Sequence, residues 1–198
     1  MSGRKGLAVS VDEVLEEATR RALRVIEEKN PEHPDKEGAA RMVALGAIRF
    51  AMVKTEPKKQ IDFRYEEALS FEGDTGPYVQ YAHARAHAIL RKAGAWGRPD
   101  FAQATPYERA LALALLDFEE AVREAAAERT PHVLAQYLLD LAGSWNAYYN
   151  AKEEGRPATP VLTAPEGLRE LRLELVRSLQ ETLRTGLGLL GIPAPEVM

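Results

Sequence analysis

Residues 105–131 read TPYERALALALLDFEEAVREAAAERTP, and this stretch decides the fold class of the 198-residue chain. Thr105 and Glu108 form a capping box, and Pro106 takes the first helical position, where proline is tolerated. Helix-compatible residues then continue to about Glu128, and Thr130-Pro131 repeats the start signal. The stretch therefore predicts one long helix followed directly by another.

The same signals recur along the rest of the chain. Ser10 and Glu13 form a second capping box, and Asp35 provides another N-cap. All twelve prolines fall in proposed connections or first turns, and none lies in a helix interior, where it would cost about 3 kcal/mol. No convincing alternating strand pattern occurs. We therefore predict an all-α bundle of about six helices, with segments over about 11–29, 36–54, 77–93, 105–128, 131–153 and 163–190, and one or two turns over 65–71.

Composition narrows the classes of function. The chain has no cysteine, which excludes a disulfide framework, a thiol nucleophile and any Cys-ligated zinc or iron–sulfur site. It has no stretch of 18 apolar residues and no apolar segment of the secretory-signal type near its start, so we expect no membrane span and a cytoplasmic protein. The net charge is −4, yet Lys and Arg outnumber Asp and Glu over 1–60, which leaves room for a local basic face.

One candidate site lies in the helix predicted over 77–93. Tyr78, Tyr81 and Arg85 stand at i, i+3 and i+7 and share one helix face, while His83 and Lys92 extend its polar side. Aromatic rings stack on unpaired bases, and arginine pairs with phosphate or stacks itself. The alternative is that both tyrosines pack in the core with their hydroxyl groups at its edge.

A second aromatic cluster lies in the helix predicted over 131–153. Trp145, Tyr148 and Tyr149 stand at i, i+3 and i+4. Because these positions cannot all be buried equally, we expect at least one ring to be partly exposed. The cluster is either a surface for bases or a partner, or a set of core anchors.

Two further patterns resemble known binding motifs but do not indicate a metal site or a dinucleotide site. His83 and His87 have the i, i+4 spacing of metal ligands, but no glutamate follows the first histidine and Arg85 would oppose a cation, so we expect no metal site. Residues 186–191, GLGLLG, match the dinucleotide-binding pattern by letter only, because they follow a helix rather than a strand. Small residues there favour close helix packing instead.

Taken in order, four stretches resemble the C-terminal part of class I arginyl-tRNA synthetases, and together they cover nearly the whole chain. The first stretch, which begins at Met1, resembles the family's signature loop, usually written Lys-Met-Ser-Lys-Ser. The second stretch, which begins at Ala40, is the most specific to the family. The stretches are MSGRKG followed by VSVDEVLEEA, ARMVALGAIRFAMVKTEPKKQIDF followed by EEALSFEGDTGPYVQYAHAR, SWNAYY, and GLGLLGIPAPEVM.

The resemblance implies a helical anticodon-binding domain over 76–198, and over 1–75 a signature loop with helices that adjoin a catalytic domain. It implies tRNA(Arg) as the partner, with phosphate contacts from basic residues, stacking by exposed rings and base-edge hydrogen bonds. The residues that it singles out for tRNA binding are Tyr78, Gln80, Tyr81, Arg85, Trp145, Asn146, Tyr148 and Tyr149.

The sequence also departs from that family. Its nucleotide-binding domain is missing, and the signature loop survives only as Met1, Ser2, Gly3 and Arg4, without the lysine expected before the methionine. The resemblance therefore implies that ATP serves the full-length enzyme, that this chain holds no complete catalytic site, and that it does not aminoacylate by itself. The competing hypothesis is a helical protein-interaction module that does not bind RNA.

Overall fold

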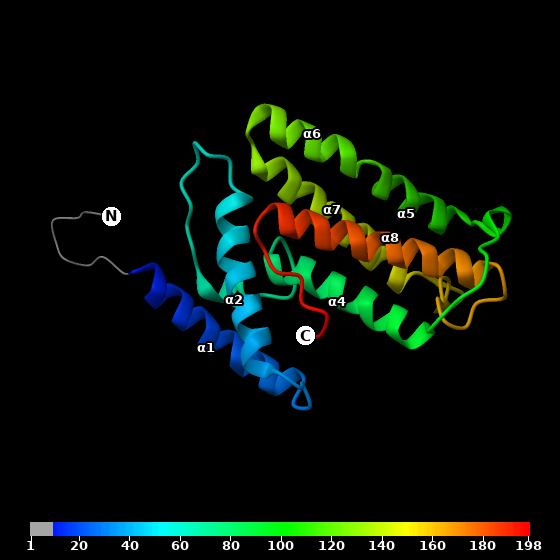
Figure 1. Ribbon diagram of the computed structural model, residues 1–198, viewed down its shortest axis with the longest axis horizontal. Helices are drawn as coiled ribbons and strands as arrows, with labels where there is room; N and C mark the ends of the chain where they lie inside the picture. The colour runs from blue at the N-terminus through cyan, green and yellow to red at the C-terminus, as the bar shows by residue number, and fades with distance from the viewer. Residues whose placement is uncertain (1–9) are drawn as a thin grey trace.

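The computed structural model describes residues 10–198, and it is built almost entirely from helices (Figure 1). The remnant signature loop, Met1 to Arg4, lies outside the described residues. Within the described part, no helix combines the length and apolarity needed to cross a membrane. The elements are α1 (Val11–Lys29), α2 (Lys36–Val53), α3 (Tyr65–Ala68), α4 (Gly76–Ala93), the 3₁₀ turn η1 (Phe101–Gln103), α5 (Pro106–Leu116), α6 (Phe118–Glu128), α7 (Pro131–Asn150), β1 (Lys152–Glu153), β2 (Arg156–Pro157) and α8 (Leu168–Leu189).

Helices α4 to α8 lie together as an elongated bundle, and α1 and α2 pack on each other at one end of it (Figure 1). The large core of the bundle is centred on Trp145, Leu138 and Leu179, and a smaller core joins α1 to α2 around Ile26 and Val43. Helix α2 links the two, because its fully buried Phe50 belongs to the large core. The division of the chain into 1–75 and 76–198 stays a prediction.

The predicted helix starts are present. The Ser10 hydroxyl accepts from the backbone N–H of Glu13 at 3.1 Å, and the Glu13 carboxylate accepts from the backbone N–H of Ser10 at 2.9 Å. Asp35 caps α2 in the same way, and Thr75 caps α4. No proline lies in the interior of a described helix. The all-α prediction is therefore confirmed, and so is the local chemistry on which it depends.

The prediction of one long helix over 105–128 is wrong in one respect. The helix breaks at Asp117, and the chain forms the two helices α5 and α6. The Ala114 carbonyl would accept from Phe118 in a continuous helix, but here it accepts from the hydroxyl of Tyr137 on α7 at 3.0 Å. The break lets both short helices pack along α7. Tertiary contact thus overrides a local sequence that favours helix throughout.

The boundaries at the other end of the bundle also differ. Helix α7 ends at Asn150 rather than near 153, and β1 and β2 form a tight hairpin with Glu154 and Gly155 both at positive φ. This is the backbone of a two-residue hairpin turn. Helix α8 begins at Leu168 rather than near 163, because Gly167 adopts φ +82° immediately before it.

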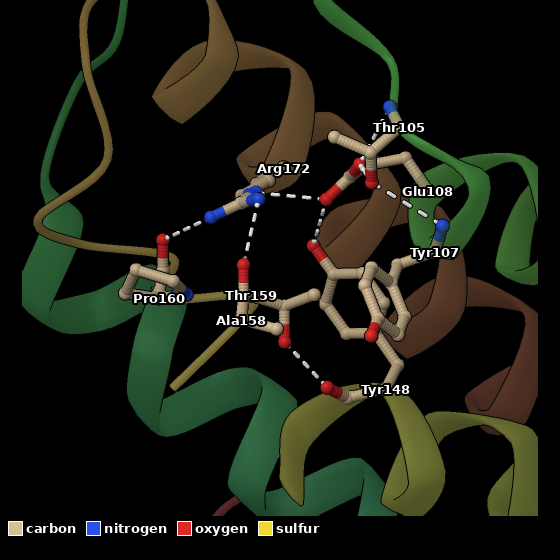
Figure 2. Close-up of polar contacts among 8 residues, drawn as sticks. All are labelled: Thr105, Tyr107, Glu108, Tyr148, Ala158, Thr159, Pro160 and Arg172. Carbon is tan, nitrogen blue, oxygen red and sulfur yellow. Dashed lines mark hydrogen bonds and ion pairs between the residues drawn. The ribbon is translucent and has the colours of Figure 1, made fainter. Parts of the chain in front are cut away.

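A buried ion pair ties four segments of the bundle together (Figure 2). The Arg172 Nε on α8 lies 2.9 Å from Glu108 Oε1 on α5, and both side chains are almost completely buried. The Tyr148 hydroxyl on α7 donates to the same carboxylate oxygen at 3.1 Å. Arg172 also donates to the carbonyl groups of Pro160 and Ala158 at 2.9 and 3.3 Å, in the segment that precedes α8.

Several hydrogen bonds determine the charge state of Glu108. Burial raises the pKa of its carboxyl group, but the hydrogen bonds from Thr105 and the charge and hydrogen bond of Arg172 together hold the pKa below its usual value. The carboxylate is therefore ionised at neutral pH and fully paired. Because Tyr148 is bonded to it, this pair also fixes the end of α7 that carries the aromatic cluster.

Glycines permit the closest helix contacts. A Cβ atom at Gly76 would lie 2.4 Å from the Gly46 carbonyl oxygen, so α4 could not approach α2 as it does. A Cβ atom at Gly186 would lie 2.6 Å from a methyl group of Leu138. The GLGLLG stretch thus has the expected packing role at Gly186, whereas Gly188 faces open space.

We expect Gly76→Ala to lower the free energy of unfolding by about 1–3 kcal/mol, because the new methyl group meets backbone that cannot rotate away. Gly188→Ala is the matched control, and it should be neutral or slightly stabilising, since alanine has the higher helix propensity. Urea denaturation measures both. Equal stability for the two variants would contradict the close approach of α4 to α2.

We expect Glu108→Gln to cost about 3 kcal/mol or more of stability, because it leaves the Arg172 charge buried without a counter-ion. Glu119→Gln is the control, since the Glu119–Arg123 pair is exposed and should contribute little. Since the folded-state pKa of Glu108 is lowered, its contribution is present above the unfolded pKa of about 4.3 and is lost as pH falls. Unfolding followed from pH 7 to pH 3 should therefore show a steeper loss in the parent chain than in Glu108→Gln.

Candidate nucleic-acid interface

A cleft lies where α1, α4 and α7 meet the loop after α3. Its volume is about 740 Å³, and its wall combines rings with cationic side chains. The carboxylates of Glu72, Asp74 and Asp140 also line the cleft. The residues that matter most for its chemistry are Lys29, Phe71, Tyr78, Tyr81, Arg85 and Met198.

Arg85 is the central charge of this cleft. Its guanidinium carbon lies 4.8 Å from the centre of the Tyr81 ring on α4 and 4.6 Å from the centre of the Tyr149 ring on α7. Nη2 donates to the Tyr81 hydroxyl at 3.0 Å, and Nη1 lies 3.4 Å from Oδ1 of Asn146. A cation held over two rings is stabilised by their negative faces. Helical spacing on α4 brings Tyr81 to Arg85, while the packing of α7 brings Tyr149.

Aromatic contacts continue on both sides of Arg85. Toward α1, Tyr81 meets Phe71 edge-to-face at 6.1 Å, and the Lys29 ammonium lies 5.8 Å from the Phe71 ring centre. Toward the core, Tyr149 packs against Trp145 at 5.5 Å. The rings and charges therefore form one continuous row from α1 to α7, which we call the aromatic row.

Two rings of the sequence-predicted set are open to solvent. Tyr81 is 38% exposed and Tyr149 is 42% exposed, while Tyr78 and Arg85 are half-buried in the cleft wall. The expectation that at least one ring of the second cluster is partly exposed is confirmed by Tyr149. These are the side chains with surface available for a ligand.

Three of the side chains predicted to contact RNA are buried in the structure. Gln80 is fully buried, and its Nε2 donates to the carbonyl groups of Met42 and Pro193 at 3.0 and 2.8 Å, while its Oε1 is buried without a hydrogen-bond partner. Trp145 is 1% exposed, and Tyr148 is 4% exposed with its hydroxyl bonded to Glu108. These three side chains are packed among neighbouring helices, and a part for them in RNA binding stays a prediction.

Sequence reasoning did not single out Lys29, Phe71 or Met198, which all line the cleft. Lys29 carried only the weak signal of a basic residue in the last turn of a helix. Phe71 precedes the glycine loop at 73–76, and an aromatic residue beside such a loop was the available clue. Nothing local marked Met198, whose carbonyl accepts from the Asn30 amide at 3.1 Å across the chain.

His83 and His87 both have protein partners. The His83 ring lies 2.9 Å from the Pro195 carbonyl oxygen, and the Gln180 amide approaches one nitrogen of each imidazole at 3.4 and 3.2 Å. Burial lowers the pKa of His83, which favours the neutral ring. Within residues 10–198, no group of three or more His, Asp or Glu side chains is placed to hold a metal ion.

Comparison with known families identifies the larger part of the chain. Residues 79–198 match the model of the DALR anticodon binding domain. The chain belongs to this family. Residues 1–65 match the model described as "tRNA synthetases class I (R), catalytic domain". The helical bundle is thus a DALR domain, and residues 1–65 are similar to the class I catalytic model.

Curated relatives carry the DALR domain within longer proteins. An arginine–tRNA ligase from Thermus thermophilus is 87% identical over 198 residues, which cover all of this chain and 33% of that protein. The Deinococcus radiodurans enzyme is 48% identical over 208 residues, again with all of this chain and 34% of its own length. The chain therefore spans about a third of the length of these relatives.

Solved structures agree with the fold. Thermus thermophilus arginyl-tRNA synthetase superposes with a TM-score of 0.97 at 85% identity, and the match covers all of this chain and 33% of that one. The Plasmodium falciparum enzyme superposes with a TM-score of 0.81 at 22% identity over 96% of this chain and 34% of its own, which supports the fold alone.

The DALR match bears on the candidate site through its position in the chain. It begins one residue after Tyr78 and includes Tyr81, Arg85 and Tyr149. Lys29 and Phe71, which complete the cleft, lie outside it. The cleft is thus walled by the DALR domain on one side and by the preceding helices on the other. The role of each side chain toward RNA stays a prediction.

Proposed function

We propose that the cleft of this DALR domain binds the anticodon arm of a tRNA, and that the partner is tRNA(Arg). The observation that carries the proposal is Arg85, which lies in the wall of a cleft with aromatic and cationic side chains and contacts the accessible rings of Tyr81 and Tyr149. Single-stranded loops are recognised through splayed bases that stack on aromatic side chains and through donors that meet phosphates and base edges. The cleft offers both.

Each side chain has a distinct task in this proposal. The exposed ring of Tyr81 stacks on a loop base, a contact that is typically worth about 1–3 kcal/mol. Arg85 donates from the edge of its guanidinium group to a phosphate oxygen or a base carbonyl. Lys29, exposed at the end of α1, neutralises a phosphate on the opposite wall. The carboxylates at the rim favour bases with exposed amino groups over bare phosphate.

The place of this module in a larger enzyme follows from its relatives, which are named arginine–tRNA ligases. We propose that residues 1–75 adjoin a catalytic domain and that residues 76–198 hold the anticodon arm. In such an enzyme ATP activates arginine for transfer to the terminal ribose of the tRNA. The chain described here contributes a tRNA-binding site. We expect no arginine-dependent ATP–pyrophosphate exchange from it alone.

We expect Tyr81→Ala to weaken binding of a tRNA(Arg) anticodon-arm hairpin by roughly five- to 150-fold, the equivalent of one lost stacking contact of about 1–3 kcal/mol. The melting temperature should change little, because the ring is 38% exposed. Phe101→Ala is the matched control, since Phe101 is an exposed ring outside the cleft. Fluorescence anisotropy measures affinity, and calorimetry measures stability. If Tyr81→Ala only destabilises the fold, Tyr81 is a core residue and the assignment fails.

Salt dependence separates phosphate contacts from base contacts. Each phosphate neutralised on single-stranded RNA adds about 0.7 to the slope of log K against log salt. Lys29→Gln should therefore weaken binding and flatten this slope by about that amount. Lys92→Gln, on α4 but outside the cleft, is the control. Binding of the parent chain that does not respond to salt would contradict the proposed function.

A further inference from the structure

The geometry points to Tyr149 as a positioning residue that acts on RNA through Arg85 and not by its own contact. This inference rests on the proposed function, because it names how the cationic group of that cleft is aimed. It also revises the sequence-based expectation, in which Tyr149 was one of the rings that stack on loop bases.

The first step is the geometry of Arg85 itself. An arginine on a helix surface has a long, flexible side chain, and it loses rotamer freedom when it binds. Here the Tyr149 ring lies 4.6 Å from the guanidinium carbon, and the Tyr81 hydroxyl accepts from Nη2 at 3.0 Å. Tyr81 comes from the same helix, so it can follow Arg85 in any motion of α4. Tyr149 comes from α7 and holds the group relative to the rest of the bundle.

The Tyr149 ring packs against aromatic side chains of the core. It packs on Trp145 at 5.5 Å with an angle of 50° between the planes, and Trp145 stacks on Tyr148 at 5.8 Å and 21°. The Tyr148 hydroxyl then donates to the buried carboxylate of Glu108. Tyr149 is thus the exposed end of a stack whose other members are fixed in the core. A ring held in this way can keep a neighbouring cation in a fixed position.

Arg85 has hydrogen-bond donors that its protein partners do not use. Arginine carries five N–H donors, and here one is used by Tyr81 and another faces Asn146. With its guanidinium carbon over two rings, the group has little free face on which a base could stack. The remaining donors lie on its edge, so the acceptor that fits is a phosphate oxygen or a base carbonyl. A positioned edge gives better-directed hydrogen bonds than a mobile one.

A double-mutant cycle tests this inference with the anticodon-arm hairpin as the probe. We expect Tyr149→Leu to weaken binding about three- to tenfold, and Tyr149→Phe to restore it, because phenylalanine keeps the ring face toward the cation. In the Arg85→Gln background, Tyr149→Leu should change affinity by less than about twofold. Losses that simply add would show that Tyr149 meets the RNA itself. A Phe variant as weak as the Leu variant would implicate the hydroxyl group instead. Either result overturns the inference.

A second measurement needs no RNA. In the free protein with isotope-labelled arginine, the Arg85 Nε–H resonance should show a ring-current shift that Tyr149→Phe retains and that Tyr149→Leu reduces to the part due to Tyr81. The same spectra with Phe101→Leu, which alters an exposed ring outside the cleft, serve as the control. An unchanged Arg85 resonance in Tyr149→Leu overturns the positioning role even if RNA binds. Failure of the parent chain to bind RNA would refute the proposed function instead, so the two failures are distinguishable.

Discussion

The buried Glu108–Arg172 ion pair is the constraint on which the rest of this structure depends. Taking two charges out of water is costly, and the cost is offset only when the remaining donors and acceptors are satisfied. Here that requirement recruits Thr105 at the start of α5, Tyr148 at the end of α7, and the carbonyl groups of Ala158 and Pro160 before α8. The start of α5 must therefore meet the end of α7, the segment before α8 and the start of α8 in one arrangement. This is how the pair selects one packing of helices that apolar contacts alone would define less sharply.

The same constraint reaches the cleft by way of α7. Tyr148 is bonded to Glu108, Trp145 stacks on Tyr148, and Tyr149 packs on Trp145, so the orientation of the exposed ring follows from the core. Helix α4, which carries Tyr81 and Arg85, is tied to its neighbours by a different contact. Gln80 joins the carbonyl of Met42 on α2 to that of Pro193 in the C-terminal segment. The buried members of the sequence-predicted set thus hold the exposed members in place.

Local chemistry predicted most of the fold, because caps and prolines act within a few residues of themselves. Ser10, Asp35 and Thr105 begin helices where the sequence predicts them. The break at Asp117 was not predictable, since it depends on a hydroxyl group supplied by Tyr137, about one helix further along the chain. The hairpin was missed because Glu154, and not asparagine or aspartate, takes the first left-handed position of its turn. Helical spacing placed Tyr78, Tyr81 and Arg85 on one face, but it could not say which neighbouring helix would cover Gln80 or Trp145.

A cation that is held in advance is suited to selectivity as well as to affinity. A mobile arginine meets any phosphate within reach, so it contributes a largely sequence-independent attraction. When the Arg85 guanidinium is held by rings from two helices, its free donors point along fixed directions, and an RNA loop must bring an acceptor to them. The carboxylates of Glu72, Asp74 and Asp140 around the same cleft oppose phosphates that arrive elsewhere. Attraction at Arg85 and Lys29, set among these carboxylates, favours a ligand of particular shape, and this is how we propose that a chain with net charge −4 recognises a polyanion.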